Sequence, residues 1–477
     1  MEKQIIESLK SIVGSEYVTN SEVDREIYAS SAVPLPFIRR KADVVVLPGS
    51  VEEVSKVLAF ANKNKIPVTT KGAGENLQAP SIPLQGGILL SLARMDRILE
   101  IDEGNMVATV EGGCSTYALY HQLELKGLRY PGMAMYTSGP MAGSAVAGNA
   151  QGCSMIRYGA CGDQIMGLEV VLADGEVITF GTGAVSDYGY FYKYTGAPNP
   201  IGLFIQSLGT LGVVTKVTFR IVPKPQFEGY LTFAWSSNGL REASKALYEL
   251  ATLGVYNIDV WDHWSFWSAI KSGKLPAFPP ETEILGLISV DGDSEAELKL
   301  KEERVKEICG DYSGIDWGEK ICKSIFGPPD YLMWEISAIN YNTRRLIKSA
   351  ALFSFYFVPI LKFAEDYELF REIMEKYEFW NEKNLPRYRG WAIVPATFSA
   401  YPGFYCRGEE EKGWEALQEL EEELLKRGAV PYGMGPTWPK SALERLGPQF
   451  ELMKKIRVIL DPNNILNPGH LFQTQER

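Results

Sequence analysis

Two glycine-rich segments in the first half of the chain have the residue types of phosphate-binding loops. Lys71-Gly72-Ala73-Gly74-Glu75-Asn76 directly follows the β-branched stretch Ile66–Thr70. Glycine permits a positive φ and leaves the backbone N–H groups unobstructed, and consecutive N–H groups can surround a pyrophosphate. The second segment, Thr137–Asn149, is made mostly of small residues. Such residues allow a flat ring or a phosphate to lie directly against the backbone.

Neither loop matches the two commonest nucleotide-binding signatures. The lysine pattern of the phosphate-binding loop is missing. In the dinucleotide fingerprint G-x-G-x-x-G opens a helix, whereas Gly72-x-Gly74 is followed by Leu77 and by no helical pattern. A nicotinamide-binding Rossmann domain is therefore disfavoured. For each loop taken alone, a tight and closely packed turn is the alternative.

Thiol and imidazole groups are too scattered to predict a metal centre. The chain has six cysteines without any C-x-x-C pair, which suits neither a disulfide framework nor an iron–sulfur cluster. Its three histidines, His121, His263 and His470, are far apart in sequence, so no metal site is predicted, although distant residues can converge. We expect reduced thiols and a cytoplasmic protein.

Alternating apolar segments predict the elements that position the glycine loops. Helices are expected over residues 3–13, 50–64 and 116–126, the second with a Ser50/Glu53 capping box. Ala173-Asp174-Gly175 predicts a hairpin turn. Strands are expected at Val44–Leu47, Ile66–Thr70, Gly87–Ser91, Met106–Glu111, Leu168–Leu172, Glu176–Phe180 and Val213–Ile221.

Length and composition divide the chain and exclude some functions. A chain of 477 residues needs two or three domains, and aromatic content rises after Pro225. We expect domains over residues 1–227 and 228–425, with residues 426–477 folding back because the loop Asp461–His470 cannot continue a helix. The net charge of -11 disfavours nucleic acid as a partner.

Membrane and export signals are not expected. The first ten residues mix charged and apolar side chains, so no signal peptide is predicted. The longest apolar run, Ala350–Leu361, is too short to span a bilayer and predicts a core helix or an exposed apolar surface. A soluble protein without a transmembrane segment is expected.

From about Lys41 to Pro225, the sequence resembles the FAD-binding domain of the vanillyl-alcohol oxidase/p-cresol methylhydroxylase superfamily, which also contains glycolate oxidase and D-lactate dehydrogenase. The ending Leu460–Gly469 resembles the closing loop of that family. The resemblance implies an α+β fold, with a two-part FAD-binding domain and an α+β cap domain over the flavin ring. The matching segments, in order, are Leu47–Val54, Lys71–Gly74, Ser138–Asn149, Leu168–Gly175 and Gly202–Lys216.

The resemblance also implies which residues hold FAD. The pyrophosphate would lie on the segment from Lys71 to Asn76, and Val214 would meet the adenine end through its backbone. No His or Cys in this loop is available for covalent attachment, so non-covalent FAD is expected, with attachment from the cap left open. The residues implied to line the flavin or to follow in the next loop are Ser138, Gly139, Gly143, Ser144, Gly148, Asn149, Tyr158, Gly159, Gly162 and Asp163.

The catalytic groups of relatives are only partly present. Val430-Pro431-Tyr432-Gly433 resembles the Tyr-Arg pair of the phenol-oxidising branch, with Gly433 in place of arginine. The acidic residue of that branch near flavin N5 is replaced in the Gly139-Pro140 region. The His-rich metal motif of the 2-hydroxy-acid branch is absent, and Leu208 replaces its usual glutamate.

Several side chains in the second domain could bind substrate or act in catalysis, but each also has a purely structural explanation. Five arginines could clamp a carboxylate, but surface salt bridges are the expected role of most of them. His263 is interpreted as a satisfied core histidine within an aromatic cluster rather than as a base. The arginines are Arg344, Arg345, Arg387, Arg389 and Arg407, and the aromatic cluster is Trp261, Trp264, Phe266 and Trp267.

The resemblance implies hydride transfer from a C–H bond of a small molecule to flavin N5. Apolar or aromatic alcohols and para-substituted phenols are favoured, with Tyr432 bonding the substrate oxygen and His470 stabilising the reduced flavin. The alternatives are a lactate- or glycolate-type 2-hydroxy-acid dehydrogenase and a non-catalytic electron-transfer subunit. An electron-acceptor subunit and a homo-oligomer are the possible protein partners.

Overall fold

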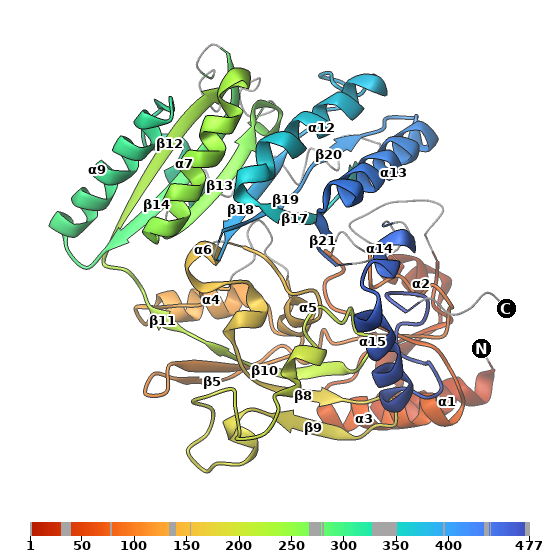
Figure 1. Cartoon of the computed structure of the whole chain (residues 1–477). Helices are drawn as coiled ribbons and strands as arrows, with labels where there is room; N and C mark the ends of the chain where they lie inside the picture. Colours follow the sequence, from red (N-terminus) through yellow and green to blue (C-terminus); the bar gives the residue numbers. More distant parts are fainter. Residues whose placement is uncertain are drawn as a thin grey trace. The chain divides into compact units, whose positions relative to one another are not determined.

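The computed structural model describes two compact units (Figure 1). Unit 1 comprises Met1–Gly152, Ala160–Pro223 and Gly433–Arg477, and unit 2 comprises Cys153–Gly159 and Lys224–Tyr432. The described residues are 2–29, 40–76, 79–132, 140–152, 154–266, 278, 281–326, 351–394, 396–433, 438 and 440–472.

The first sheet of unit 1 presents the loop that starts at Gly72. Its strands lie in the order β1-β2-β4-β3, with β2, β4 and β3 parallel and β1 antiparallel to β2. Two helices, α1 (Lys3–Val13) and α3 (Val51–Lys63), contribute apolar faces to the same core. The strands are β1 Val18–Thr19, β2 Val44–Val46, β3 Val68–Lys71 and β4 Ile88–Ser91.

The second sheet of unit 1 is antiparallel, in the order β5-β6-β10-β8-β9. The hairpin predicted at residues 173–175 is confirmed, because β8 and β9 pair there and Gly175 has a φ of +92°. The strands are β5 Ile98–Asp102, β6 Val107–Glu111, β8 Ile165–Val171, β9 Val177–Phe180 and β10 Val213–Arg220, with a separate pair of β7 Leu128–Arg129 and β11 Val222–Pro223.

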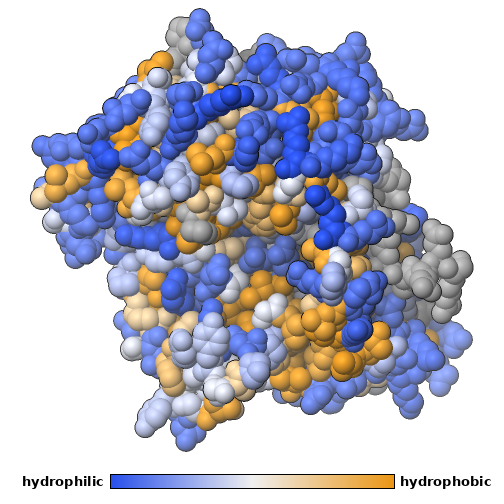
Figure 2. All heavy atoms as spheres, viewed as in Figure 1, coloured by the Kyte–Doolittle hydropathy of each residue, from blue (hydrophilic) through white to orange (hydrophobic). Residues whose placement is uncertain are grey.

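Further helices complete unit 1. The last part of the chain returns to the first sheet of this unit. Leu466, in the predicted closing loop, forms a parallel bridge with Val68 of β3. Figure 2 shows hydrophobic side chains gathered around α15, which exposes Leu452, Val458 and Ile459. The helices are α2 Glu22–Tyr28, α4 Thr116–Glu124, α5 Ala142–Ala147, α14 Lys440–Glu444 and α15 Pro448–Leu460.

Unit 2 is built on one large antiparallel sheet whose described strands lie in the order β15-β12-β14-β13-β18-β19-β17-β21. The strands are β12 Phe227–Ser236, β13 Asn257–Asp262, β14 Thr282–Gly292, β15 Ile315–Asp316, β17 Tyr356–Pro359, β18 Arg389–Ile393, β19 Thr397–Ala400 and β21 Val430–Pro431, with a separate pair of β16 Ala351–Phe353 and β20 Gly403–Tyr405. Its helices are α6 Met155–Tyr158, α7 Leu240–Leu253, α9 Glu295–Asp311, α10 Lys320–Phe326, α12 Phe363–Lys376 and α13 Glu410–Arg427.

The helix or exposed surface predicted at Ala350–Leu361 is wrong, because this run forms β16 and β17. Its burial alternates with the period of a strand. Tyr356 and Val358 are buried, whereas Phe355 and Phe357 between them are half-buried. Aromatic and β-branched residues favour this extended conformation, and the strand partners supply its hydrogen bonds.

The register of β13, β18 and β19 defines one face of the unit 2 sheet that carries polar and aromatic groups. Trp261 lies opposite Arg389, Asp259 opposite Trp391, and Trp391 opposite Ser399. Directly opposite residues in antiparallel strands point to the same side. We call this side the Trp261 face.

Candidate cofactor and substrate sites

The turn after β3 offers a group of free backbone donors. Within the described part of the chain, the N–H groups of Gly72, Ala73 and Gly74 donate to no protein acceptor. Gly74 has a φ of +76°, which a residue with a side chain rarely adopts. Consecutive N–H groups in such a turn create a concave site for an anion.

Lys71 stands at the base of this turn. Its side chain is 6% exposed, and Nζ donates to the carbonyl of Tyr28 at 2.7 Å. Burial lowers the pKa of Lys71 to about 8. Its ammonium is held at the Tyr28 carbonyl and is still mostly charged at neutral pH, and an anion bound nearby would favour that charged form.

The two predicted glycine loops lie against one another. A Cβ at Gly72 would come within 2.0 Å of Ser144 Oγ, and one at Gly148 within 2.9 Å of Asn76 Nδ2. Gly143 donates to the carbonyl of Gly112 at 2.8 Å. These glycines are needed because side chains would push the loops apart, so the close-packing alternative applies here, and the binding-loop prediction stays a prediction.

The loop around residue 162 lies against the second glycine loop. Gly162 donates its N–H to Asn149 Oδ1 at 2.9 Å, and Asn149 has a φ of +48°. Asp163 Oδ2 accepts from the N–H of Ala160 at 2.8 Å. The carbonyl of Val214 lies 2.8 Å from where a Cβ of Gly143 would stand. Segments separated widely in sequence are thus brought together within unit 1.

Four of the predicted cofactor residues do not belong to this described group in unit 1. Tyr158 and Gly159 belong to unit 2, where the Tyr158 ring contacts Tyr256 edge-on at 6.3 Å. Ser138 and Gly139 lie outside the described residues.

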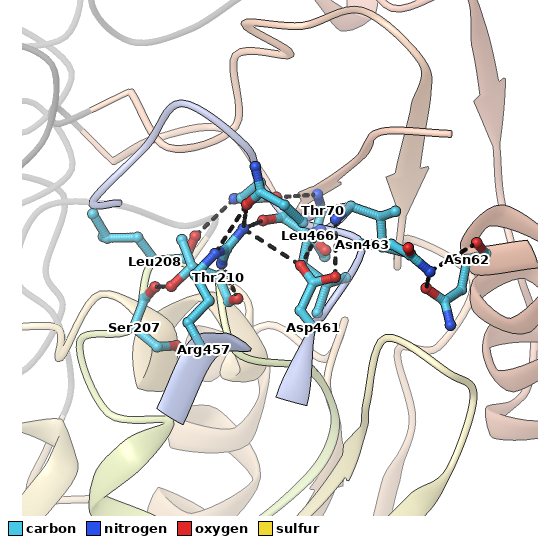
Figure 3. Close-up of polar contacts among 12 residues, drawn as sticks. Asn62, Thr70, Ser207, Leu208, Thr210, Arg457, Asp461, Asn463 and Leu466 are labelled. Carbon is cyan, nitrogen blue, oxygen red and sulfur yellow. Dashed lines mark hydrogen bonds and ion pairs between the residues drawn. The ribbon is translucent and has the colours of Figure 1, made fainter. Parts of the chain in front are cut away.

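Sequence reasoning missed a polar network that fastens the closing loop to the glycine-loop sheet (Figure 3). Asn467 Oδ1 accepts from the N–H of Thr70 at 3.0 Å. Its Nδ2 donates to the carbonyls of Pro80 at 3.1 Å and Leu208 at 2.7 Å. The only sequence signal was the polar, turn-rich character of the run, which does not identify Asn467 as the bridging residue.

A buried arginine completes the network. Arg457 donates to the carbonyls of Thr210 and Leu466, the latter at 2.6 Å, and to Asn464 Oδ1. Asp461 accepts from the N–H groups of Ile465 and Leu466 at 2.9 and 2.8 Å. These hydrogen bonds hold the closing loop next to β3 and the turn that follows it.

His470 is buried beside this loop. It is 2% exposed. Its Nε2 lies 2.8 Å from the carbonyl of Ile82, whereas Nδ1 has no hydrogen-bond partner among the described residues. Burial lowers the pKa of His470, which favours the neutral ring. For His470 to act as a cation near the flavin, the pH would therefore have to be lower than for an ordinary histidine.

Tyr432 lies in unit 2, in a group of aromatic rings. Its N–H donates to the carbonyl of Phe355 at 2.9 Å. Its ring meets Phe357 edge-on at 5.6 Å and Phe355 at 6.2 Å, and Phe355 in turn stacks on Tyr401 at 4.3 Å. These four rings form what we call the aromatic wall.

Two of the candidate arginines are buried, so a surface salt bridge is the wrong interpretation for them. Arg387 and Arg389 are 6% and 5% exposed. Arg407 is exposed, and Arg344 and Arg345 lie outside the described residues. The interpretation of His263 as satisfied holds only in part, because the ring is hydrogen-bonded to the backbone of Glu283, whereas Nδ1 is buried without a hydrogen-bond partner among the described residues.

Two protein families match separate segments of the chain. The FAD binding domain family matches residues 42–181, and the C-terminal domain of FAD linked oxidases matches residues 440–471. The probable mitochondrial D-lactate dehydrogenase of Danio rerio is 32% identical, and the alignment covers 99% of this chain and 92% of that protein. The chain belongs to the FAD-linked oxidases.

Other relatives of this FAD-linked oxidase align with most or all of its length. Glycolate oxidase subunit GlcD of Bacillus subtilis is 25% identical over 100% of this chain and 98% of that protein. The D-lactate dehydrogenase of Archaeoglobus fulgidus is 29% identical over 90% and 91%. An oxidoreductase that uses FAD is therefore the class of this enzyme.

Solved structures show the same fold. p-Cresol methylhydroxylase with substrate bound superposes with a TM-score of 0.83 at 18% identity, covering 98% of this chain and 96% of that one. 4-Ethylphenol oxidase from Gulosibacter chungangensis gives a TM-score of 0.81 at 20% identity, covering 98% and 96%. The expected α+β fold of this superfamily is confirmed.

The residues present suit FAD in this FAD-linked oxidase. The N–H groups of Gly72–Gly74, which have no protein acceptor, would supply donors for a pyrophosphate, and Lys71 next to them in the chain carries a positive charge. Among the described residues, no group of three or more His, Cys, Asp or Glu side chains could hold a metal ion. A search of the same residues finds no helix that could span a membrane.

Proposed function

We propose that this FAD-linked oxidase removes hydrogen from a C–H bond of an apolar or aromatic alcohol, or of a para-substituted phenol. When bound, FAD supplies the hydride acceptor at N5. The aromatic wall of Phe355, Phe357, Tyr401 and Tyr432 is the observation that carries this proposal. Such rings bind an apolar substrate and exclude water from it.

Tyr432 is the proposed hydrogen-bonding residue. It is half-buried at the end of the aromatic wall, with its backbone fixed by the bond to Phe355. In this proposal its hydroxyl holds the substrate oxygen and thereby orients the C–H bond that breaks.

For the cofactor, we propose that the pyrophosphate binds at Lys71–Asn76. Gly143, Ser144, Gly148, Asn149, Gly162, Asp163 and Val214 would line the remainder, and their packing against one another supports this. Ser138, Gly139, Tyr158 and Gly159 complete the proposed set.

Anaerobic single-turnover reduction tests the proposed substrate class. A para-alkylphenol, a benzylic alcohol, D-lactate and glycolate would each be mixed with the FAD-loaded enzyme while flavin absorbance is followed. We expect faster bleaching with the aromatic compounds. Tyr432→Phe should slow that reduction at least tenfold without changing FAD content, whereas Tyr188→Phe, whose side chain is 84% exposed, should not. Unchanged reduction in Tyr432→Phe would remove this residue from the mechanism.

A 2-hydroxy acid is the second candidate substrate. The names D-lactate dehydrogenase and glycolate oxidase among full-length relatives support it, and so do the buried Arg387 and Arg389. Exclusive reduction by D-lactate or glycolate in the same assay would favour this alternative. Membership of the FAD-linked oxidases disfavours an electron-transfer subunit without substrate chemistry.

We also propose that the electrons leave to a separate protein in the cytoplasm. The name glycolate oxidase subunit for a full-length relative supports a partner subunit. Reoxidation of the substrate-reduced enzyme by oxygen, a cytochrome, an electron-transfer flavoprotein and an iron–sulfur protein tests this. Oxygen as the fastest acceptor would contradict it.

A further inference from the structure

We propose that Arg157 is a positioning residue for the cofactor loops: from unit 2, it fixes two of the residues proposed to line FAD in unit 1. These two residues are Asn149 and Gly162, which precede and follow α6 in the chain. This inference rests on the proposed function in that these residues are taken to contact the flavin. The attachment of α6 depends only on contacts within each unit.

The chain leaves unit 1 after one cofactor loop and returns to it at the next, and α6 between them belongs to unit 2. The two ends of this excursion are bonded to each other inside unit 1. The N–H of Cys161 donates to the carbonyl of Ala150 at 3.0 Å, and the N–H of Gly162 donates to Asn149 Oδ1 at 2.9 Å. The chain between Ala150 and Cys161, which we call the α6 loop, therefore has its base in unit 1 and its helix in unit 2.

The helix of the α6 loop is too short to hold its own conformation. It has four residues, Met155–Tyr158, whereas isolated helices of fewer than about 12 residues are marginal in water. It begins after Ser154, whose φ of +60° is unfavourable for a residue with a side chain, and it ends at Gly159, with a φ of +82°. Contacts with the rest of unit 2 must therefore hold α6 in place.

Arg157 supplies the charged contact between α6 and the unit 2 sheet. Its Nη1 donates to Oδ2 of Asp291 at the end of β14, and the two side chains are 31% and 11% exposed. Partial burial shields the pair from water, so this charge-assisted hydrogen bond should stabilise more than an exposed one. A backbone bond adds to it, because the N–H of Val394 donates to the carbonyl of Met155 at 3.3 Å.

Asp291 has a second cationic neighbour, which provides a matched control. Lys301 Nζ lies 3.7 Å from Asp291 Oδ1 and donates to the carbonyl of Asp291 at 2.7 Å. Lys301 belongs to α9 of the same unit. Both cations neutralise one carboxylate, but only Arg157 lies on the α6 loop. Removing Lys301 therefore perturbs Asp291 and leaves α6 attached.

Loss of the Arg157 contact should loosen the base of the α6 loop as well as its helix. A loop that is held at its base and its tip samples fewer conformations than one held only at its base. When α6 comes free, the hydrogen bonds from the Cys161 and Gly162 amides open at a lower free-energy cost, and both amide protons exchange faster. Asn149 would then hold a less fixed position as well.

Hydrogen–deuterium exchange of the FAD-loaded full chain tests this attachment without any turnover. We expect Arg157→Met to speed exchange of the Cys161 and Gly162 amides about fivefold or more. The Gly175 amide, in the β8–β9 hairpin of the same unit, should exchange as in the wild type, which distinguishes local loosening from global unfolding. Lys301→Met should leave all three amides unchanged.

Two further variants test the ion pair itself. Arg157→Lys should recover most of the protection, because an ammonium can pair with the same carboxylate. Asp291→Asn removes the charge from the other partner and should match the exchange of Arg157→Met within about twofold. FAD should dissociate about fivefold faster or more from Arg157→Met and Asp291→Asn than from the wild type or Lys301→Met.

Unchanged exchange of the Cys161 and Gly162 amides in folded Arg157→Met would overturn the inference. If that variant did not fold, the same two amides in the isosteric variant Asp291→Asn would decide. Equally fast exchange in Lys301→Met would also overturn it, because the effect would then follow the charge at Asp291 and not the attachment of α6.

Failure of the proposed cofactor placement would look different. Faster exchange of both amides, together with an unchanged rate of FAD release, would refute the placement of FAD against Asn149 and Gly162 and leave the attachment of α6 intact. Loss of flavin from Gly74→Asp, together with unchanged exchange in Arg157→Met, would support the cofactor placement and overturn the role of Arg157.

Discussion

The side chain of Asn467 accepts a hydrogen bond from the backbone N–H of Thr70 at 3.0 Å, although the two residues are 397 positions apart in the chain. Thr70 immediately precedes Lys71 and the free N–H groups of the turn. The same amide group donates to Pro80 and Leu208, which lie on two further loops. One asparagine thus fixes three segments around the proposed pyrophosphate site.

Replacing Asn467 by Asp should destabilise unit 1 and weaken FAD binding. The substitution removes the donor to two buried carbonyls and puts a negative charge beside them, for a loss of about 2–4 kcal/mol in unfolding free energy. Urea unfolding and FAD titration of the apo-protein would measure both effects. Asn463→Ala is the control, because Asn463 bonds to the side chain of Asn62 at an exposed position. Equal stabilities of the two variants would contradict the bridging role.

Gly74→Asp should yield protein without a full flavin spectrum. A side chain is strained at φ +76°, and its charge would oppose the pyrophosphate. Gly196→Asp is the matched control, since Gly196 has a φ of +82° and nothing within 4 Å of an added Cβ. We expect full flavin content in the control and at least a tenfold weaker FAD affinity in Gly74→Asp. Similar flavin content in both would place the pyrophosphate elsewhere.

FAD affinity should fall as the pH rises through about 8. The folded apo-protein holds Lys71 with its pKa lowered to about 8, so the cation that favours a bound pyrophosphate is present below that pH and is lost above it. The affinity should decrease by up to about tenfold per pH unit between pH 8 and 10. Titrations of Lys71→Met should lack this slope, whereas the exposed-lysine variant Lys63→Met should keep it. A slope that persists in Lys71→Met would assign it to another group.

His470 should make the protein less stable in acid. Because burial lowers its pKa in the folded state, the unfolded chain binds the proton more readily below about pH 6.5, and stability falls as the pH decreases. Each pH unit would remove at most about 1.4 kcal/mol. Urea unfolding at pH 5, 6 and 7 should show a shallower dependence for His470→Gln, which retains a donor for the Ile82 carbonyl. His121→Gln is the control, and identical slopes in all three proteins would show that His470 does not titrate in this way.

Local patterns predicted the elements near the cofactor well, because each is encoded over a few consecutive residues. Ser50 caps α3 as expected, accepting from the N–H of Glu53, and Gly175 adopts the positive φ of the predicted hairpin. The helices at residues 3–13 and 116–126 are found at Lys3–Val13 and Thr116–Glu124. From sequence alone the glycines of the two loops could be assigned to binding or to packing, and the structure shows the packing.

Distant pairings could not be predicted, because no local pattern specifies the partner. β17 lies between β19 and β21, and its Tyr356 is opposite Pro431. The stacking of Arg389 on Trp261 depends on the register of β13 and β18, which residue types alone did not specify. For the same reason the sequence did not indicate which of the five candidate arginines would be buried.

The bridge between Val68 and Leu466 has a consequence for biosynthesis. The ribosome releases the partner of β3 only after it has made all of unit 2, so the proposed FAD site acquires this last supporting segment late in synthesis. A fragment that ends at Pro223 would lack Asn467 and Arg457, and it should load flavin poorly. Supplying residues 433–477 as a separate peptide should restore loading in trans, as in a split-protein complementation assay.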